Sequence, residues 1–238
     1  MPGARTKPSM RLLPGLSRPL GISLPLLLIL AAVRPARAQS NSEFPRNDAQ
    51  AWVDIGATHD LRQKVQLMMN LGLRWSDDAG HLVYRRVGAG LAFKVSDYLT
   101  LSPYYNYYST DSTPVHETRE NRLAMAATVE TPLGRWKVRD RNLFERRFLI
   151  GSKTWRYRNR LEFERNLRLA HRQLRFFIWN EVFYDSAVGA WSRNRAALGA
   201  GKEISKRLSV DLYYLRQNDS HSRPGDLNVL GMTVRAKF

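Results

Sequence analysis

The sequence predicts an all-β protein, a transmembrane antiparallel up-and-down β-barrel of 10–12 strands, with 12 the preferred number. Three observations support this fold class. Apolar and polar residues alternate along most of the chain, the N-terminus has the pattern of a secretory signal, and the last predicted strand finishes at Phe238. Because successive side chains of a strand point to opposite faces, this alternation gives each strand one apolar and one polar face.

The first 38 residues are expected to be a signal peptide. They contain six basic residues and no acidic one, followed by the apolar run 21–33 and the small-x-small sequence Ala36-Arg37-Ala38. This order is typical of secretory signals, and the run is shorter than the ~20 residues that a membrane-spanning helix needs. We expect cleavage near Ala38. Translation can start at Met1 or at Met10, and a start at Met10 would shorten the basic region.

The chain that remains after cleavage has 200 residues, with 32 basic and 21 acidic side chains and a net charge of +11. The basic residues are spread along it, and no block of five or six consecutive basic residues marks a nucleic-acid-binding tail. We therefore expect no nucleic-acid partner. The absence of cysteine excludes a disulfide framework, a Cys-based zinc site and a thiol nucleophile.

Residues 39–48 are expected to form a short periplasmic or lumenal segment, and residues 49–238 the barrel. Eleven segments alternate in the barrel, most of them 10–14 residues long, close to the roughly 9–11 residues that cross a bilayer at a tilt. Shorter and longer polar links take turns between them, as in outer-membrane barrels. The segments are 49–58, 63–75, 82–95, 98–109, 118–131, 135–147, 153–165, 172–184, 191–204, 207–217 and 227–238.

The segment 153–165 has the clearest alternation. Its apolar face carries Trp155, Tyr157, Asn159, Leu161 and Phe163, and its charged face carries Arg156, Arg158, Arg160, Glu162 and Glu164. A soluble β-sandwich or lipocalin-like barrel would have strands of about 5–6 residues and would have to accommodate such charged faces. In a transmembrane barrel the apolar faces meet lipid and the charged faces line a wet lumen.

The segment 135–147 fits this pattern least well, because Asp140 and Asn142 share a face with Trp136 and Phe144. Single-chain bacterial barrels normally have an even number of strands. Eleven segments therefore leave three possibilities: a strand is hidden, one segment such as 135–147 is outside the wall, or the N-terminal segment threads the lumen.

The C-terminal segment resembles the signal by which the outer-membrane assembly machinery recognises its clients. One face carries an apolar residue at every second position up to the chain end: Leu230, Met232, Val234, Ala236 and Phe238. Together with the secretory signal, this predicts the bacterial outer membrane as the location, with its lipid and its assembly machinery as partners.

Four stretches resemble the domain-of-unknown-function family 2490 of predicted bacterial outer-membrane β-barrel proteins. They are Trp155–Glu162, Asn180–Asp185, Trp191–Arg195 and Asp211–Gln217. The resemblance covers essentially the whole chain after the signal. It implies the fold and the location, and it carries over no activity and no site residue.

The sequence contains no catalytic, cofactor-binding or metal-binding motif. None of the five histidines pairs with another at i+2 or i+4, and no carboxylate–histidine cluster has metal-ligand spacing. The best candidates for the catalytic residues of a barrel hydrolase are His221-Ser222 and His116-Glu117, and neither pair has a third member to complete a triad. An enzyme is the less favoured prediction.

The lumen-facing charges are the candidate site. They form an arginine-rich zone predicted to be a constriction, made of Arg156, Arg158, Arg160, Glu162, Glu164, Arg175, Glu181, Arg193, Arg195 and Glu203. Arginine presents several fixed donors to carboxylate or phosphate, so the preferred function is a narrow passive channel for small anionic solutes. The alternatives are a closed structural or adhesion barrel, in which Arg–Glu pairs fill the lumen, and an outer-membrane hydrolase acting on lipid or peptide. The oligomeric state is left open.

Overall fold

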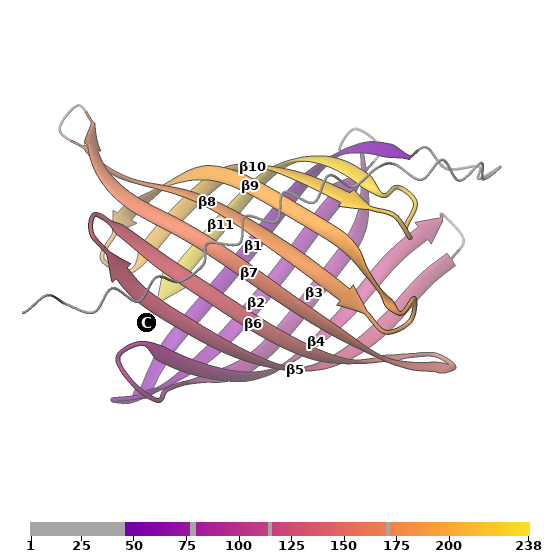
Figure 1. Ribbon diagram of the computed structural model, residues 1–238, viewed down its shortest axis with the longest axis horizontal. Helices are drawn as coiled ribbons and strands as arrows, with labels where there is room; N and C mark the ends of the chain where they lie inside the picture. The colour runs from indigo at the N-terminus through magenta and orange to yellow at the C-terminus, as the bar shows by residue number, and fades with distance from the viewer. Residues whose placement is uncertain (1–45, 77–79, 114–115, 170–171) are drawn as a thin grey trace, which may run out of the picture. The chain divides into compact units, whose positions relative to one another are not determined.

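The computed structural model describes residues 46–76, 80–113, 116–169 and 172–238, which form one closed β-barrel (Figure 1). The predicted signal peptide and most of the segment 39–48 lie outside the described residues. Eleven strands make the wall: β1 Asn47–Arg62, β2 Val65–Ser76, β3 His81–Lys94, β4 Leu99–Thr113, β5 His116–Leu133, β6 Trp136–Leu149, β7 Ser152–Leu169, β8 Arg172–Asp185, β9 Ala190–Ser205, β10 Leu208–Asp219 and β11 Asp226–Lys237.

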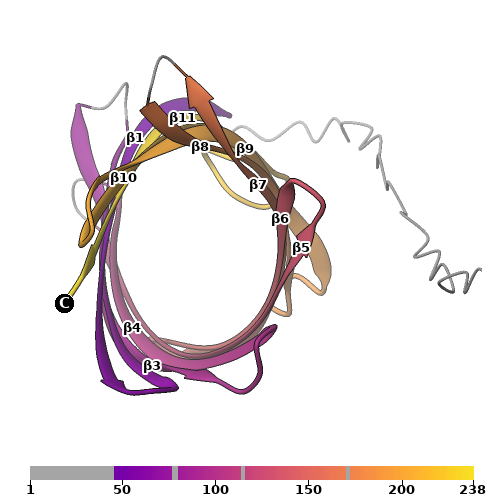
Figure 2. The same cartoon turned by 90° about the vertical axis from the view of Figure 1, so that its left-hand side faces the viewer.

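The barrel closes between its first and last strands, which run parallel (Figure 2). Their register runs from Asn47 opposite Asp226 to Thr58 opposite Lys237. The preference for 12 strands and a wholly antiparallel wall was therefore wrong: the wall has 11 strands and one parallel pair. Each strand reverses the direction of the one before it, so after an odd number the last strand points the same way as the first. A parallel ladder still pairs the backbone groups, and closure leaves no edge.

The doubtful segment 135–147 lies within β6 except for its first residue, and β6 is a wall strand paired with β5 over its whole length and with β7 from Lys137 onward. Gly134 and Gly151, with φ of 60° and 75°, lie in the turns at its two ends. Such positive φ values strain residues that have a Cβ, so glycine is suited to both turns. Asp140 and Asn142 point outward from this strand, on the face that also carries Phe144.

The two ends of the barrel are distinguished by their links. The turn end carries the links β1–β2, β3–β4, β5–β6, β7–β8 and β9–β10 and the C-terminus, where the Phe238 amide donates to the Thr58 carbonyl over 2.9 Å. The loop end carries the start of β1 and the other links, of which β10–β11, residues 220–225, is the longest. The polar stretch 110–117 expected as a long link is mostly strand, because β4 extends to Thr113 and β5 begins at His116.

The outward face of the wall is apolar and the inward face is polar. Leu230, Leu198 and Ile178 are 70%, 60% and 52% exposed on the outside, whereas Glu145 and Glu181 are fully buried inside. On the inside, an apolar cluster of Trp52, Trp179, Leu215 and Val229 with its neighbours fills the part of the lumen next to β1 and β8–β11. No helix among the described residues is long and apolar enough to cross a membrane.

Candidate functional site

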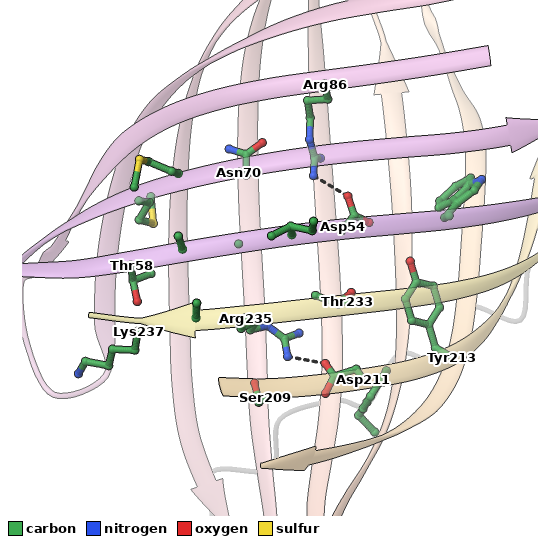
Figure 3. A pocket seen from close by; sticks show the side chains of 18 of the residues that line it. Asp54, Thr58, Asn70, Arg86, Ser209, Asp211, Tyr213, Thr233, Arg235 and Lys237 are labelled. Carbon is green, nitrogen blue, oxygen red and sulfur yellow. Dashed lines mark hydrogen bonds and ion pairs between the residues drawn. The ribbon is translucent and has the colours of Figure 1, made fainter. Parts of the chain in front are cut away.

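The lumen contains two cavities, one open to each end of the barrel. The loop-end cavity has a volume of about 830 Å³ and the turn-end cavity about 650 Å³. In the turn-end cavity, Arg86 reaches Asp54 and Arg235 reaches Asp211 (Figure 3). The two cavities abut at the middle of the barrel.

Five side chains line both cavities, and we call them the arginine waist: Arg74, Arg86, Tyr108, Arg158 and Arg195. They come from β2, β3, β4, β7 and β9, so the waist draws on strands around most of the wall. These five side chains therefore lie where the two cavities meet.

Arg74 is held by two aromatic rings. Its guanidinium carbon lies 3.8 Å from the centroid of the Trp52 ring and 4.0 Å from that of Tyr84. The register explains this sandwich, because Trp52 and Tyr84 are the direct cross-strand partners of Arg74 on β1 and β3 and share its inward face. Within the described chain the guanidinium makes no hydrogen bond and no ion pair, so its N–H donors face the two cavities.

Arg195 also lies near the indole of Trp52. Its guanidinium carbon lies 4.9 Å from the ring centroid of Trp52 and 4.9 Å from that of Phe183, and its Nε donates to Gln217 Oε1 over 2.7 Å. Arg195 is 5% exposed, and no carboxylate of the described residues lies within ion-pair distance of it. The waist therefore contains two oriented guanidinium groups, Arg74 and Arg195, that form no direct ion pair with the described residues.

Arg158 differs from these two arginines, because its charge is balanced. It lies 2.9 Å from the Glu181 carboxylate and 3.6 Å from that of Glu145. Glu181 also accepts from Arg141 at 2.8 Å and from Arg160 at 3.1 Å. These ion pairs close the part of the lumen next to β6, β7 and β8.

Further ion pairs line the two cavities. At the loop end, Glu120 binds Arg122 at 2.7 Å and Arg147 at 2.5 Å, and Asp185 binds Arg147 and Arg156. At the turn end, Asp54 binds Arg86 at 2.6 Å. Each carboxylate there fixes the direction of one or more guanidinium groups.

Both cavities are lined by more cations than anions. The loop-end cavity is lined by nine arginines and by three acidic residues, Asp48, Asp111 and Glu120. The turn-end cavity is lined by nine arginines, Lys206 and Lys237, and by four acidic residues. This excess gives the lumen a positive field that favours anions. The arginines of the loop-end cavity are Arg74, Arg86, Arg122, Arg147, Arg156, Arg158, Arg193, Arg195 and Arg223.

The ten residues predicted as a constriction are spread along the lumen and do not form one ring. Arg158 and Arg195 belong to the waist. Arg156 and Arg193 line the loop-end cavity, and Arg160, Glu162, Arg175 and Glu203 line the turn-end cavity. Glu164 and Glu181 are buried in ion pairs with arginine.

Arg74, Arg86 and Tyr108 belong to the waist but were not among the residues predicted from the sequence to form the constriction. Each sits on the polar face of its strand, so the alternation places its side chain inward. The sandwich of Arg74 by Trp52 and Tyr84 depends on the register of β1, β2 and β3, which the alternation does not specify.

The side chains considered for hydrolysis do not form a triad. Ser220 Oγ lies 2.7 Å from His221 Nδ1 in the β10–β11 link, but Asp219 pairs with Arg193 at 2.5 Å and accepts the His221 backbone amide. Glu117 binds Arg119 and Ser109. In the part of the chain that the structure describes, no group of three or more His, Asp or Glu side chains is placed to hold a metal ion.

Comparisons with known proteins add a family and two structural neighbours. The profile of a family described as a protein of unknown function (DUF2490) matches residues 49–228. A solved structure described as KdgM porin matches with a TM-score of 0.42 and 12% identity, covering 70% of this chain and 82% of its own. LpxR from Salmonella typhimurium matches with a TM-score of 0.45 and 10% identity, covering 75% and 84%. No curated protein matches the sequence.

Proposed function

The chain belongs to the DUF2490 family of proteins of unknown function, and we propose that it is an outer-membrane barrel that lets small anionic solutes pass through the arginine waist. The signal peptide, removed near Ala38, directs export, and the C-terminal strand directs assembly into the membrane.

The outward face supports placement in a membrane. Large apolar side chains are exposed all around the wall, among them Ile55 on β1, Val87 on β3, Phe144 on β6 and Leu212 on β10, at 41%, 55%, 55% and 57%. Soluble monomers rarely expose apolar patches larger than a few hundred Å². Lipid would cover this face, and the closed ladder would leave no backbone group unpaired in it.

The observation that carries the passage proposal is that neither Arg74 nor Arg195 has a direct ion-pair partner among the described residues. A desolvated cation without a partner is costly, and a carboxylate or phosphate of a solute would offset that cost. The cationic excess of both cavities would attract anions toward the waist from either end.

The rest of the lumen favours a narrow passage over a wide one. Glu145 and Glu181 already neutralise Arg158, and the apolar cluster around Trp52 fills the adjoining space next to β1 and β8–β11. An 11-stranded barrel also lies between 8-stranded barrels filled by side chains and 16–18-stranded barrels with an aqueous channel. We therefore place the passage next to Arg74, Arg86 and Arg195.

The test is the conductance of the refolded chain 39–238 in a planar bilayer. We expect small, stable current steps and a reversal potential in a KCl gradient that reports anion preference. The absence of current from protein that is inserted and shows the heat-modifiable electrophoretic mobility of a folded barrel would contradict the proposal. It would favour a closed barrel.

A further inference from the structure

Four polar side chains form a cluster on the outward face of β6 and β7, which we call the polar island: Asp140, Asn142, Tyr157 and Asn159. Asn159 Nδ2 donates to Asp140 Oδ1 over 2.6 Å and to Asn142 Oδ1 over 3.2 Å. Asn142 Nδ2 donates to Asp140 Oδ2 over 3.1 Å, and the Tyr157 hydroxyl donates to Asn142 Oδ1 over 2.5 Å.

The polar island lies in an apolar part of the wall. Asp140 is paired across the strands with Val129 and Leu161, which are 43% and 37% exposed to the outside. Asn142 and Asn159 are direct partners, and each is seven residues from the β6–β7 turn. At about 3.3 Å per residue, this is about 23 Å along a tilted strand, well inside the membrane-facing part of the wall.

Three other sites of outward-facing asparagines contain no carboxylate, although Asn228 also accepts from Arg216 over 3.2 Å. Tyr105 donates to Asn121 over 2.5 Å, Tyr214 donates to Asn228 over 2.7 Å, and Asn180 and Asn194 bond to each other. The polar island differs from these pairs because it contains a carboxylate, and no lysine or arginine of the described chain forms an ion pair with it. A charged group facing the hydrocarbon of a membrane is costly and rare, so its presence points to a partner that covers it.

The polar island has unused hydrogen-bond donors and acceptors that can pair with those of a second, identical island. Asn142 Nδ2 uses one of its two N–H groups, while Asn159 Oδ1 accepts nothing from the described residues and Asp140 accepts only two bonds. A second island facing the first can therefore receive the spare Asn142 N–H on an oxygen of Asp140 or Asn159, and it can return the same bond.

We propose that the polar island is the centre of an interface between two copies of this chain in the outer membrane. A two-fold axis along the membrane normal brings identical residues together at the same depth, as an isologous interface requires. The proposal rests on the membrane placement given above, and it is independent of the passage through the waist.

An aromatic cluster beside the island extends this surface. Phe144 contacts Tyr157 with ring centroids 4.9 Å apart, Tyr157 contacts Trp191 at 6.0 Å, and Trp191 contacts Tyr184 at 5.7 Å. Rigid aromatic area around a small polar centre is typical of protein interfaces. The island and these rings lie on the outer face of β6, β7, β8 and β9.

The test uses the fact that the chain contains no cysteine. Full-length exported protein carrying Leu161→Cys, beside the island, is oxidised in vesicles of outer-membrane lipid, with Phe144→Cys as a second position on the same face. The matched control is Ile55→Cys on β1, which lies across the barrel and is 41% exposed, close to the 37% of Leu161. We expect at least tenfold more disulfide-linked dimer from Leu161→Cys than from Ile55→Cys.

The second arm adds Asp140→Leu and Asn142→Leu to the Leu161→Cys chain. These changes make the wall more apolar, so the barrel should still fold and keep its heat-modifiable mobility, while the dimer yield should fall at least tenfold. Equal yields at the two cysteine positions, an unchanged yield after the leucine substitutions, or a lipid or a different protein bound at the island would overturn the interface. Failure to insert would overturn both proposals, whereas missing current with intact cross-linking would overturn only the passage.

Discussion

At the scale of single residues, the arginines of the lumen are stabilised in two different ways. Arg158 is balanced by Glu145 and Glu181, whereas Arg74 and Arg195 both contact the Trp52 ring. Cation–π contact holds a guanidinium in place without neutralising it. The aromatic contacts can therefore keep a solute-binding group oriented while its charge stays available.

The first prediction concerns Glu181, which is fully buried and binds Arg141, Arg158 and Arg160. Glu181→Gln leaves three guanidinium groups without their shared carboxylate, so we expect the free energy of unfolding to fall by about 3–5 kcal/mol. Urea titration of the folded barrel in detergent, followed by tryptophan fluorescence, measures this. Glu117→Gln, at an exposed carboxylate, should leave the midpoint unchanged, and equal effects of the two substitutions would refute the buried network.

The alternation of residue types specifies which way a side chain points, but not which residue it meets. Arg156, Arg158, Arg160 and Glu162 line the two cavities, as does Arg74 on β2. The contact of Arg74 with Trp52 depends on the register between β1 and β2, which are paired through a two-residue turn. A slip of one residue would turn every side chain of β2 to the other face.

At the scale of elements, small residues on one strand make room for large ones on the next. A Cβ on Gly90 of β3 would lie 2.3 Å from Tyr104 Cβ and 2.5 Å from the Pro103 carbonyl oxygen on β4. Gly88 faces Asn106 and the Tyr105 carbonyl in the same way. The glycines therefore let the bulky side chains of β4 enter the lumen.

Gly90→Ala tests this fit. Because its contacts include backbone, the strands have to separate, and we expect a loss of about 1–3 kcal/mol in the free energy of unfolding. Gly56→Ala on β1 is the matched control, since a Cβ there meets no atom within 4 Å. The urea midpoints of the two variants measure this loss of stability. If Gly90→Ala left the midpoint unchanged, the packing between β3 and β4 would be looser than described.

The closing pair β1–β11 is the element that sequence analysis did not predict. Alternation identified the strands, including β6 with its outward Asp140 and Asn142, but the even-number rule favoured a twelfth strand. The rule reflects how most bacterial barrels return both termini to one side, and nothing in β-sheet hydrogen bonding forbids a parallel closure.

Direct pairing of these strands is testable with Ala51→Cys and Leu230→Cys, which stand opposite each other in the β1–β11 register. Neighbouring strands lie about 4.8 Å apart, within disulfide reach, whereas an intervening strand would double the separation. We expect oxidation to link the two cysteines within one chain, as shown by a mobility shift that reductant reverses. If the two cysteines stay unlinked in the folded protein, β1 and β11 are not direct neighbours and a twelfth strand lies between them.

At the scale of the whole molecule, much of the positive charge of the chain lies in the lumen. Many of the basic residues that give the sequence its excess of cations line two inward cavities, while the outer wall is mostly apolar. The fold class followed from the sequence because alternation is local. The waist did not follow, because it combines side chains of five strands between β2 and β9 whose register the alternation does not specify.

Ion selectivity tests the central claim most directly. The reversal potential in a KCl gradient is measured for the wild type, for Arg74→Glu/Arg195→Glu, and for Arg119→Glu, which lies outside the lumen and is exposed. The account predicts anion preference in the wild type, its loss or inversion in the double variant, and no change in Arg119→Glu. An anion preference that survives the double substitution at an unchanged conductance would contradict passage through the arginine waist.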